Sequence, residues 1–143
     1  SAENIHAEQL EFEITEGVLM SGESYINNAL RELNKLGIKL SMDDFGTGYS
    51  SISYLRQYSF DVLKIDKSFV NGITANKSDC DLVKATIAMA HSLGLIVVAE
   101  GVEYIDQLKL LNVLECDYIQ GFYFSKPIRG QNLIALDLSA IAS

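Results

Sequence analysis

Short apolar segments alternate along the chain with longer segments in which apolar residues recur every three or four positions. The short segments have the length and alternation of β-strands, and the longer ones have the period of amphipathic helices. The predicted strands are Leu10–Thr15, Ile38–Asp43, Val62–Ile65, Ile96–Ala99 and Tyr118–Gln120. The predicted helices are Ser24–Leu36, Ser51–Gln57, Asp79–Leu93 and Ile105–Leu111.

Two of these helices have defined ends. Ser24–Leu36 stops at Gly37, a residue type that readily ends a helix. Asp79–Leu93 follows Ser78, which we expect to cap its first turn, and stops at Gly94. The positions expected to face inward are Ile26, Leu30 and Leu33 on the first helix and Leu82, Val83, Ile87 and Ala90 on the second.

Strands that alternate with helices predict a parallel sheet with helices on its outside. A closed eight-stranded barrel needs about 250 residues, so the segments found here would form only part of one. A doubly wound open sheet is the alternative architecture.

Polar residues stand at or near the carboxyl ends of the predicted strands, after an apolar body. They are Glu13, Asp43, Lys64, Glu100 and Gln120, and Asp44 joins them if the strand ends and the chain turns through Phe45–Gly48. A barrel builds its active site from several strand ends, whereas an open sheet binds ligands chiefly at one switch point. Five contributing strands therefore favour the barrel.

Taken singly, these residues have plainer interpretations. A glutamate on a strand is usually a solvated or paired charge, Asp43 and Asp44 could cap a helix or form a turn, and Lys64 alone would be a surface lysine. Together, four carboxylates at neighbouring strand ends repel one another and resist desolvation, which a bound cation relieves. Oxygen ligands suit Mg²⁺, Mn²⁺ or Ca²⁺, and the two histidines lie outside any zinc motif.

The net charge of −8 argues against a nucleic-acid polymer as partner, because such binding needs clustered Lys and Arg. A small phosphate ligand is compatible with it if cations lie between the two sets of negative charge. No apolar run is long enough to span a membrane, and the N-terminus lacks the features of a signal peptide. Cys80 and Cys116 lack metal-ligand spacing and are expected to be reduced, packed thiols of a cytoplasmic protein, a location compatible with a membrane tether upstream.

Five motifs resemble, in order, the signatures of the EAL domain family. They are Glu13-Ile14-Thr15-Glu16, Asp43-Asp44-Phe45-Gly46-Thr47-Gly48, Leu63-Lys64-Ile65-Asp66, Ala99-Glu100-Gly101-Val102-Glu103 and Gln120-Gly121. The resemblance covers the chain from about Leu10 to Pro127. It implies a modified TIM-type (β/α) barrel and the hydrolysis of cyclic di-GMP to linear pGpG.

The resemblance also implies roles for individual residues. Glu13, Asp43 and Glu100 match metal ligands of the catalytic centre, and Asp44 matches a residue that bridges or binds the second of two Mg²⁺ or Mn²⁺ ions. Lys64 matches the residue that positions and polarises the attacking water.

Other matches concern the surroundings of the centre. Gln120 matches a hydrogen-bonding group beside the substrate or the ligands, and Glu103 matches a structural acid. Glu16 matches the glutamate that holds the glycine-rich loop of Gly46, Thr47 and Gly48, a loop associated with metal binding and dimerisation.

The Glu-Ala-Leu motif that names the family does not occur in residues 1–143. Its glutamate and a following asparagine ligand belong to the N-terminal half of the barrel, so we interpret residues 1–143 as the C-terminal part of one EAL phosphodiesterase domain. A sensory or cyclase domain commonly precedes this domain in the family. Missing strands leave open sheet edges, which predict a homodimer or exchange of elements between protomers. Missing ligands predict weak or no hydrolysis by these residues alone.

Other functions stay open. A non-catalytic cyclic di-GMP receptor usually loses metal ligands, yet every ligand position expected in this segment is present. A structural or interaction module is disfavoured for the parent domain by the same charged strand ends, but it could describe these residues alone. A glycosidase with paired carboxylates fits the loop after Asp44 and Lys64 poorly.

Overall fold

The computed structural model describes residues 5–21, 24–46, 52–129 and 132. Their strands form one five-stranded, parallel sheet in the order β1-β2-β3-β4-β5. The strands are β1 Glu11–Thr15, β2 Lys39–Phe45, β3 Val62–Ile65, β4 Ile96–Ala99 and β5 Tyr118–Ile119.

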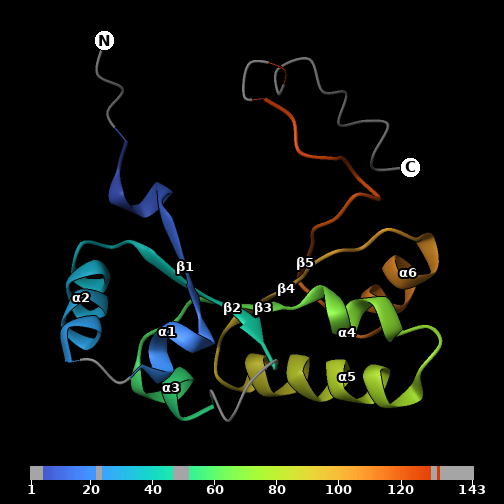
Figure 1. Ribbon diagram of the computed structural model, residues 1–143, viewed down its shortest axis with the longest axis horizontal. Coiled ribbons are helices and arrows are strands. Elements are labelled where there is room, and N and C mark those ends of the chain that lie inside the picture. Colours follow the sequence, from blue (N-terminus) through green and yellow to red (C-terminus); the bar gives the residue numbers. More distant parts are fainter. Residues whose placement is uncertain (1–4, 22–23, 47–51, 130–131, 133–143) are drawn as a thin grey trace.

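The order of the strands in space follows their order in the sequence (Figure 1). Each crossover adds the next strand on the same side of the sheet, as in a β/α barrel, whereas a doubly wound sheet reverses direction at its switch point. The predicted barrel-type α/β fold is therefore confirmed, and the doubly wound alternative is wrong. Within the described residues the sheet is open, with β1 and β5 at its edges.

The helices are more numerous than the sequence pattern predicted. The described residues contain α1 Glu16–Met20, α2 Ser24–Lys35, α3 Ile52–Gln57, α4 Lys67–Gly72, α5 Lys77–Ser92 and α6 Ile105–Val113, with a 3-10 turn η1 at Ala7–Gln9. Figure 1 shows α1, α3 and α5 below the strands and α4 beyond the end of β3, above α5. The four predicted helices are present as α2, α3, α5 and α6, whereas α1 and α4 are too short to show a helical period in the sequence.

Helix α5 begins earlier than predicted, and its cap is Asn76 rather than Ser78. The Asn76 side chain accepts the backbone N–H of Ser78 at 2.9 Å, and Asn76 itself has extended backbone angles. Asn is as good an N-cap as Ser, so the earlier of the two residues starts the helix. The inward position predicted for Leu82 is also wrong, because this side chain is 45% exposed.

The hydrophobic core joins the middle of the sheet to the helices. Leu40, Leu63 and Val97 are fully buried in β2, β3 and β4, and Val83 and Ile87 of α5 pack in the same cluster. All four residues of β3 are buried because the strand has neighbours on both sides. This continuous burial is typical of a parallel sheet.

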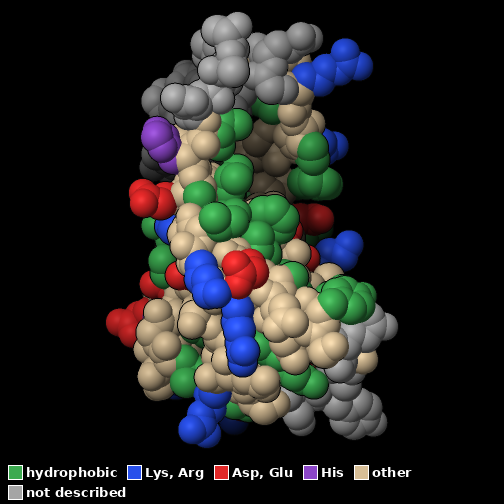
Figure 2. Space-filling model, turned by 90° about the vertical axis from the view of Figure 1, so that its left-hand side faces the viewer, with side chains coloured by type: hydrophobic (Ala, Val, Ile, Leu, Met, Phe, Trp, Pro, Cys, Tyr) green, Lys and Arg blue, Asp and Glu red, His purple; other side chains and the backbone are tan. Residues whose placement is uncertain are grey.

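The edge strand β1 is less well covered. Leu10, just before it, is 40% exposed, and Phe12 is 46% exposed. Figure 2, which views the molecule from the side of Figure 1 where β1 and α2 lie, shows hydrophobic side chains gathered on this face. The open edges predicted from the sequence are present in the described residues.

Two smaller expectations concern membranes and cysteines. The described part of the chain has no helix long and apolar enough to cross a membrane. Cys80 and Cys116 are both free and half-buried, as predicted, and burial raises the pKa of the Cys116 thiol to about 11. The cytoplasmic location inferred from these thiols stays a prediction.

Candidate active site

The end of β2 contains a bulge that turns Asp44 out of the regular strand. Met42 pairs with Leu63 and Phe45 with Ile65, so Asp43 and Asp44 together lie opposite a single residue of β3. Asp44 has a φ of 57°, in the left-handed region that Asp tolerates better than most residues, and its N–H donates to Oδ1 of Asp43 at 2.9 Å. The sequence suggested that the strand ends at Asp43, and this is wrong. The strand continues, and the bulge changes the direction of the Asp44 side chain.

Lys64 of β3 joins the ends of three strands. Its Nζ lies 2.6 Å from Oε1 of Glu13 in β1 and 2.6 Å from Oε1 of Glu100, the residue after β4. The Lys64 residue is 5% exposed, while the side chains of Glu13 and Glu100 are 51% and 21% exposed. Burial by itself lowers the pKa of Lys64, but the hydrogen bonds and charges of Glu100 and Glu13 outweigh it and hold the pKa above its ordinary value. The ammonium is therefore charged at neutral pH.

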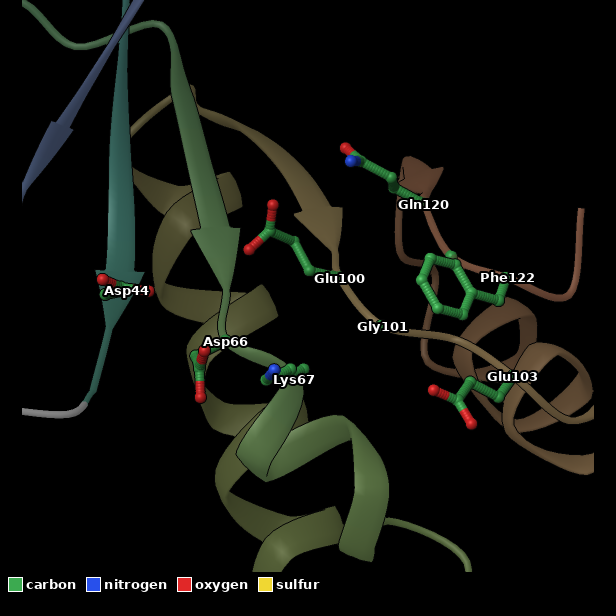
Figure 3. A pocket seen from close by; sticks show the side chains of 9 residues that line it. Asp44, Asp66, Lys67, Glu100, Gly101, Glu103, Gln120 and Phe122 are labelled. Carbon is green, nitrogen blue, oxygen red and sulfur yellow. The ribbon is translucent and has the colours of Figure 1, made fainter. Parts of the chain in front are cut away.

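A cleft of about 410 Å³ lies at the carboxyl ends of β2 to β5. Figure 3 shows the Glu100 side chain projecting between Asp44 and Asp66 on one side and Gln120 and Phe122 on the other. The residues that line the cleft are Asp44, Asp66, Lys67, Glu100, Gly101, Glu103, Gln120, Gly121 and Phe122. A barrel assembles its active site at this edge, so the cleft is the candidate active site.

The aspartates around the cleft differ in their electrostatic environment. Burial, with the neighbouring charges of Asp43 and Asp66, raises the pKa of Asp44 despite the opposing effect of Lys64. Burial also acts to raise the pKa of Asp66, but hydrogen bonds from Ser68, at the start of α4, outweigh it and lower that pKa. Negative charge is therefore in excess around Asp44, an environment that favours the arrival of a cation.

The predicted ligands lie around one cleft without forming a single group of ligands. Asp44 and Glu100 line the cleft, Glu13 reaches Glu100 through Lys64, and Asp43 contacts Asp44. Among the described residues, no three Asp, Glu, His or Cys side chains lie close enough to hold a metal ion together. The ligand roles of these residues stay predictions.

The predicted ligand atoms are of the chemical type that the predicted cation prefers, although the spacing between these atoms fits a metal site less well. The acids at the strand ends offer only oxygen atoms, which suit Mg²⁺ or Mn²⁺. Burial and the like charges of Asp43 and Asp66 raise the pKa of Asp44 more than the charge of Lys64 lowers it. These two observations support a divalent cation at the cleft.

Two further predicted site residues are placed clearly. Gln120 lines the cleft, as expected of a group beside the substrate. The Glu103 side chain is exposed and lines the cleft, so it faces the site. The backbone N–H of Glu103 donates to the Gln107 side chain at 2.9 Å, and this contact fixes the segment before α6.

The glycine-rich loop is described only at its start. Gly46 has a φ of 96°, a conformation that favours glycine. Thr47 and Gly48 lie outside the described residues. Glu16, predicted to hold this loop, is 3% exposed, and neither carboxylate oxygen has a hydrogen-bond partner among the described residues.

Sequence reasoning gave no role to Asp66, Lys67 or Phe122, all of which line the cleft. A signal for Asp66 was present, since it follows β3 directly and stands two residues after Lys64. Phe122 follows Gln120 by two residues in an irregular segment, where strand alternation no longer indicates which way a side chain points.

Comparisons with known proteins agree with this geometry. The sequence model of the EAL domain matches residues 1–127. The chain is 48% identical over 119 residues to the cyclic di-GMP phosphodiesterase NbdA of Pseudomonas aeruginosa, an alignment that covers 83% of the chain and 15% of that relative.

Two solved structures resemble this chain in three dimensions. The PaMucR phosphodiesterase in complex with c-di-GMP matches with a TM-score of 0.84 and 36% identity, over 90% of this chain and 52% of that one. The manganese and cyclic di-GMP complex of Klebsiella pneumoniae BlrP1 matches with a TM-score of 0.81 and 32% identity, over 86% of this chain and 31% of that one. The chain spans about half of the PaMucR structure. Because the EAL model matches residues 1–127, the chain belongs to the EAL domain family.

Proposed function

We propose that the chain forms the C-terminal part of a metal-dependent phosphodiesterase domain that hydrolyses cyclic di-GMP to linear pGpG. The observation that carries the proposal is the charged cleft, in which residues from four strand ends face one another. The relatives named above include a cyclic di-GMP phosphodiesterase and proteins solved with this ligand. The domain assignment of residues 1–143 is part of this proposal.

Glu13, Asp43, Asp44 and Glu100 are the residues that would hold Mg²⁺ or Mn²⁺. When bound, such ions polarise a phosphoryl oxygen and lower the pKa of a coordinated water. The residues supply the negative charge that draws cations to a chain that is itself acidic, with a net charge of −8. An anionic phosphodiester would not otherwise be attracted to this cleft.

Lys64 would orient the attacking water and offset negative charge that develops in the transition state. Its ammonium is held by Glu13 and Glu100, so it is fixed before substrate arrives. Asp66, which lies on the same wall as Asp44, adds a further carboxylate beside the scissile phosphate. Gln120 and Phe122 form the opposite wall, where an amide and an aromatic ring suit a nucleotide base.

The proposal extends to the behaviour of the 143-residue chain by itself. The exposed edge strand β1, with Phe12 uncovered, favours a homodimer or pairing with a further segment of the same domain. Hydrolysis by the chain alone is expected to be weak or nil, because part of the ligand set lies elsewhere.

Calorimetric titration of the chain with cyclic di-GMP, in the presence and absence of Mn²⁺, tests the proposal. We expect binding that requires Mn²⁺ and that is lost in Glu100→Gln. The matched control is Glu32→Gln, which removes the same charge from an exposed residue of α2 paired with Lys35. If binding does not depend on Mn²⁺ and the complete domain does not hydrolyse cyclic di-GMP, the receptor alternative is favoured. No binding of either ligand by the chain or the complete domain would contradict the proposal.

A further inference from the structure

Gln107 is a polar residue in a position where a core residue would be expected. It lies in the first turn of α6, is 2% exposed and hydrogen-bonds to the backbone of fully buried Val70. Burial of an amide costs free energy unless its hydrogen bonds are satisfied. A buried Gln at this position is therefore expected to make hydrogen bonds that stabilise the surrounding backbone.

The Gln107 amide bridges two helix ends. Its Oε1 accepts the backbone N–H of Glu103 at 2.9 Å and that of Tyr104 at 3.1 Å, at the start of α6. Its Nε2 donates to the carbonyl oxygen of Val70 at 3.2 Å, near the end of α4. Only this orientation of the amide satisfies two donors on one side and an acceptor on the other. The first N–H groups of a helix lack acceptors within the helix, whereas the Val70 carbonyl near the end of α4 also accepts the N–H of Ile73 at 3.4 Å.

The two bridged segments carry adjacent parts of the cleft wall, after the neighbouring strands β3 and β4. Helix α4 begins at Lys67, directly after Asp66, and both residues line the cleft. The segment before α6 contains Glu100 and Glu103, which line it as well. A single buried side chain therefore links the backbone that carries Asp66, after β3, to the backbone that carries Glu100 and Glu103, after β4.

Two close backbone approaches make the same region stiff. A Cβ at Gly101 would lie 2.5 Å from Cβ of Lys67, and one at Gly121 would lie 2.1 Å from the carbonyl oxygen of Val102. Val102 also donates its N–H to Gln120 at 3.1 Å. The segment that Gln107 anchors is thus packed against both other walls of the cleft, so a shift at its anchor is transmitted to them.

We propose that Gln107 is a positioning residue of the phosphodiesterase site, which sets the distance between the β3 and β4 walls of the cleft without touching substrate. The inference rests on the proposed function for its ligand. It assigns to α6, which contributes no lining residue of its own, a part in substrate affinity.

Gln107→Glu tests the bridge selectively. The carboxylate keeps both acceptor contacts at the start of α6, but it cannot donate to the Val70 carbonyl. We expect amide hydrogen exchange in α4 to rise about tenfold while the Glu103 and Tyr104 amides stay protected, since one buried hydrogen bond is lost. We expect the affinity of the chain for cyclic di-GMP with Mn²⁺ to fall about tenfold, because that bond fixes the cleft wall.

Two further variants keep the test decisive. Gln107→Leu removes all three hydrogen bonds of the side chain and should increase amide exchange both in α4 and at the start of α6. Leu111→Val is the control: it loosens the packing of α6 at a fully buried position and leaves the Gln107 hydrogen bonds in place. Leu111→Val should lower the melting temperature and leave the affinity unchanged. Unchanged exchange in α4 for Gln107→Glu would overturn the inference, as would an affinity loss that Leu111→Val reproduces. If neither the wild-type chain nor the complete domain binds cyclic di-GMP, the proposed function has failed, and exchange in α4 still decides whether the bridge exists.

Discussion

Aspartates stand at both ends of the parallel sheet, and their surroundings differ. At the amino ends, Asp61 accepts the backbone N–H of Leu40 at 2.9 Å, and Asp117 accepts that of Val97 at 2.8 Å. Each of these acids directly precedes a strand and binds the neighbouring strand. At the carboxyl ends, Asp44 lies among other carboxylates at the edge of the cleft.

The pKa values follow these surroundings. Burial acts to raise the pKa of Asp117, but the Val97 N–H and His91, whose Nε2 lies 2.8 Å away, outweigh it and lower that pKa. Burial and like charges raise the pKa of Asp44. The amino-end acids accept hydrogen bonds from neighbouring strands and hold them together, whereas at the carboxyl ends the like charges of Asp43 and Asp66 act on Asp44 against the opposing charge of Lys64. We therefore propose that the same residue type serves stability at the amino ends and ligand binding at the carboxyl ends.

The largest expected effect belongs to Lys64→Met at the carboxyl ends. Removal of the ammonium leaves Glu13 and Glu100 without their shared partner, so stability at neutral pH should fall by about 3 kcal/mol. Hydrolysis by the complete domain should fall at least about 100-fold. Urea denaturation and a cyclic di-GMP assay measure the two effects. Lys64→Arg, which keeps the charge, should recover most of the stability; equal loss in both variants would contradict the electrostatic explanation.

At the amino ends, Asp61→Ala should lower stability by about 1.5 kcal/mol, because the Leu40 N–H loses its acceptor. Asp61→Asn keeps an acceptor oxygen and should cost less. Both variants should bind Mn²⁺ as the wild type does, as calorimetry can establish. A change in Mn²⁺ affinity would break the division of roles between the two ends.

The pH dependence of stability should show that Asp117 contributes to the stability of the fold. Because its pKa is lowered on folding, its contribution is fully present above the ordinary Asp value of about 4 and is lost as pH falls through the folded-state pKa. Its side chain is 36% exposed, so screening limits the effect to less than about 1 kcal/mol. Urea denaturation between neutral and acidic pH should show a shallower acid decline in Asp117→Asn than in the wild type. Identical slopes would contradict this.

The smallest effect is expected for Asp44→Asn. The pKa of Asp44 is raised on folding, so its ionisation opposes folding as pH rises through the ordinary value, and neutralisation should stabilise the metal-free chain by about 0.3 kcal/mol. Asn tolerates the left-handed backbone of this position as well as Asp does. Melting curves should also show a smaller stabilisation by Mn²⁺ in the variant. A destabilised variant with unchanged Mn²⁺ response would place Asp44 with the structural acids.

The sequence was informative wherever local pattern decides structure. The bounds predicted for β3 and β4 are those observed, because each is a short apolar run with clear neighbours. Polar residues after those runs indicated the edge of the sheet that carries the cleft. Short helices such as α4 were missed, because six residues capped by Asp66 show no period.

By itself, then, the sequence determined the alternation of strands and helices, the family motifs and the residues from which a site could be built. The tertiary structure decided which of them meet. Lys64 contacts Glu13 across 51 positions of sequence, and a bulge at Asp44 shifts the register of β2 against β3. The amide of Gln107 finds Val70 at a separation of 37 positions. Such contacts depend on strand register and helix placement, which follow from packing of the whole sheet and leave no local pattern in the chain.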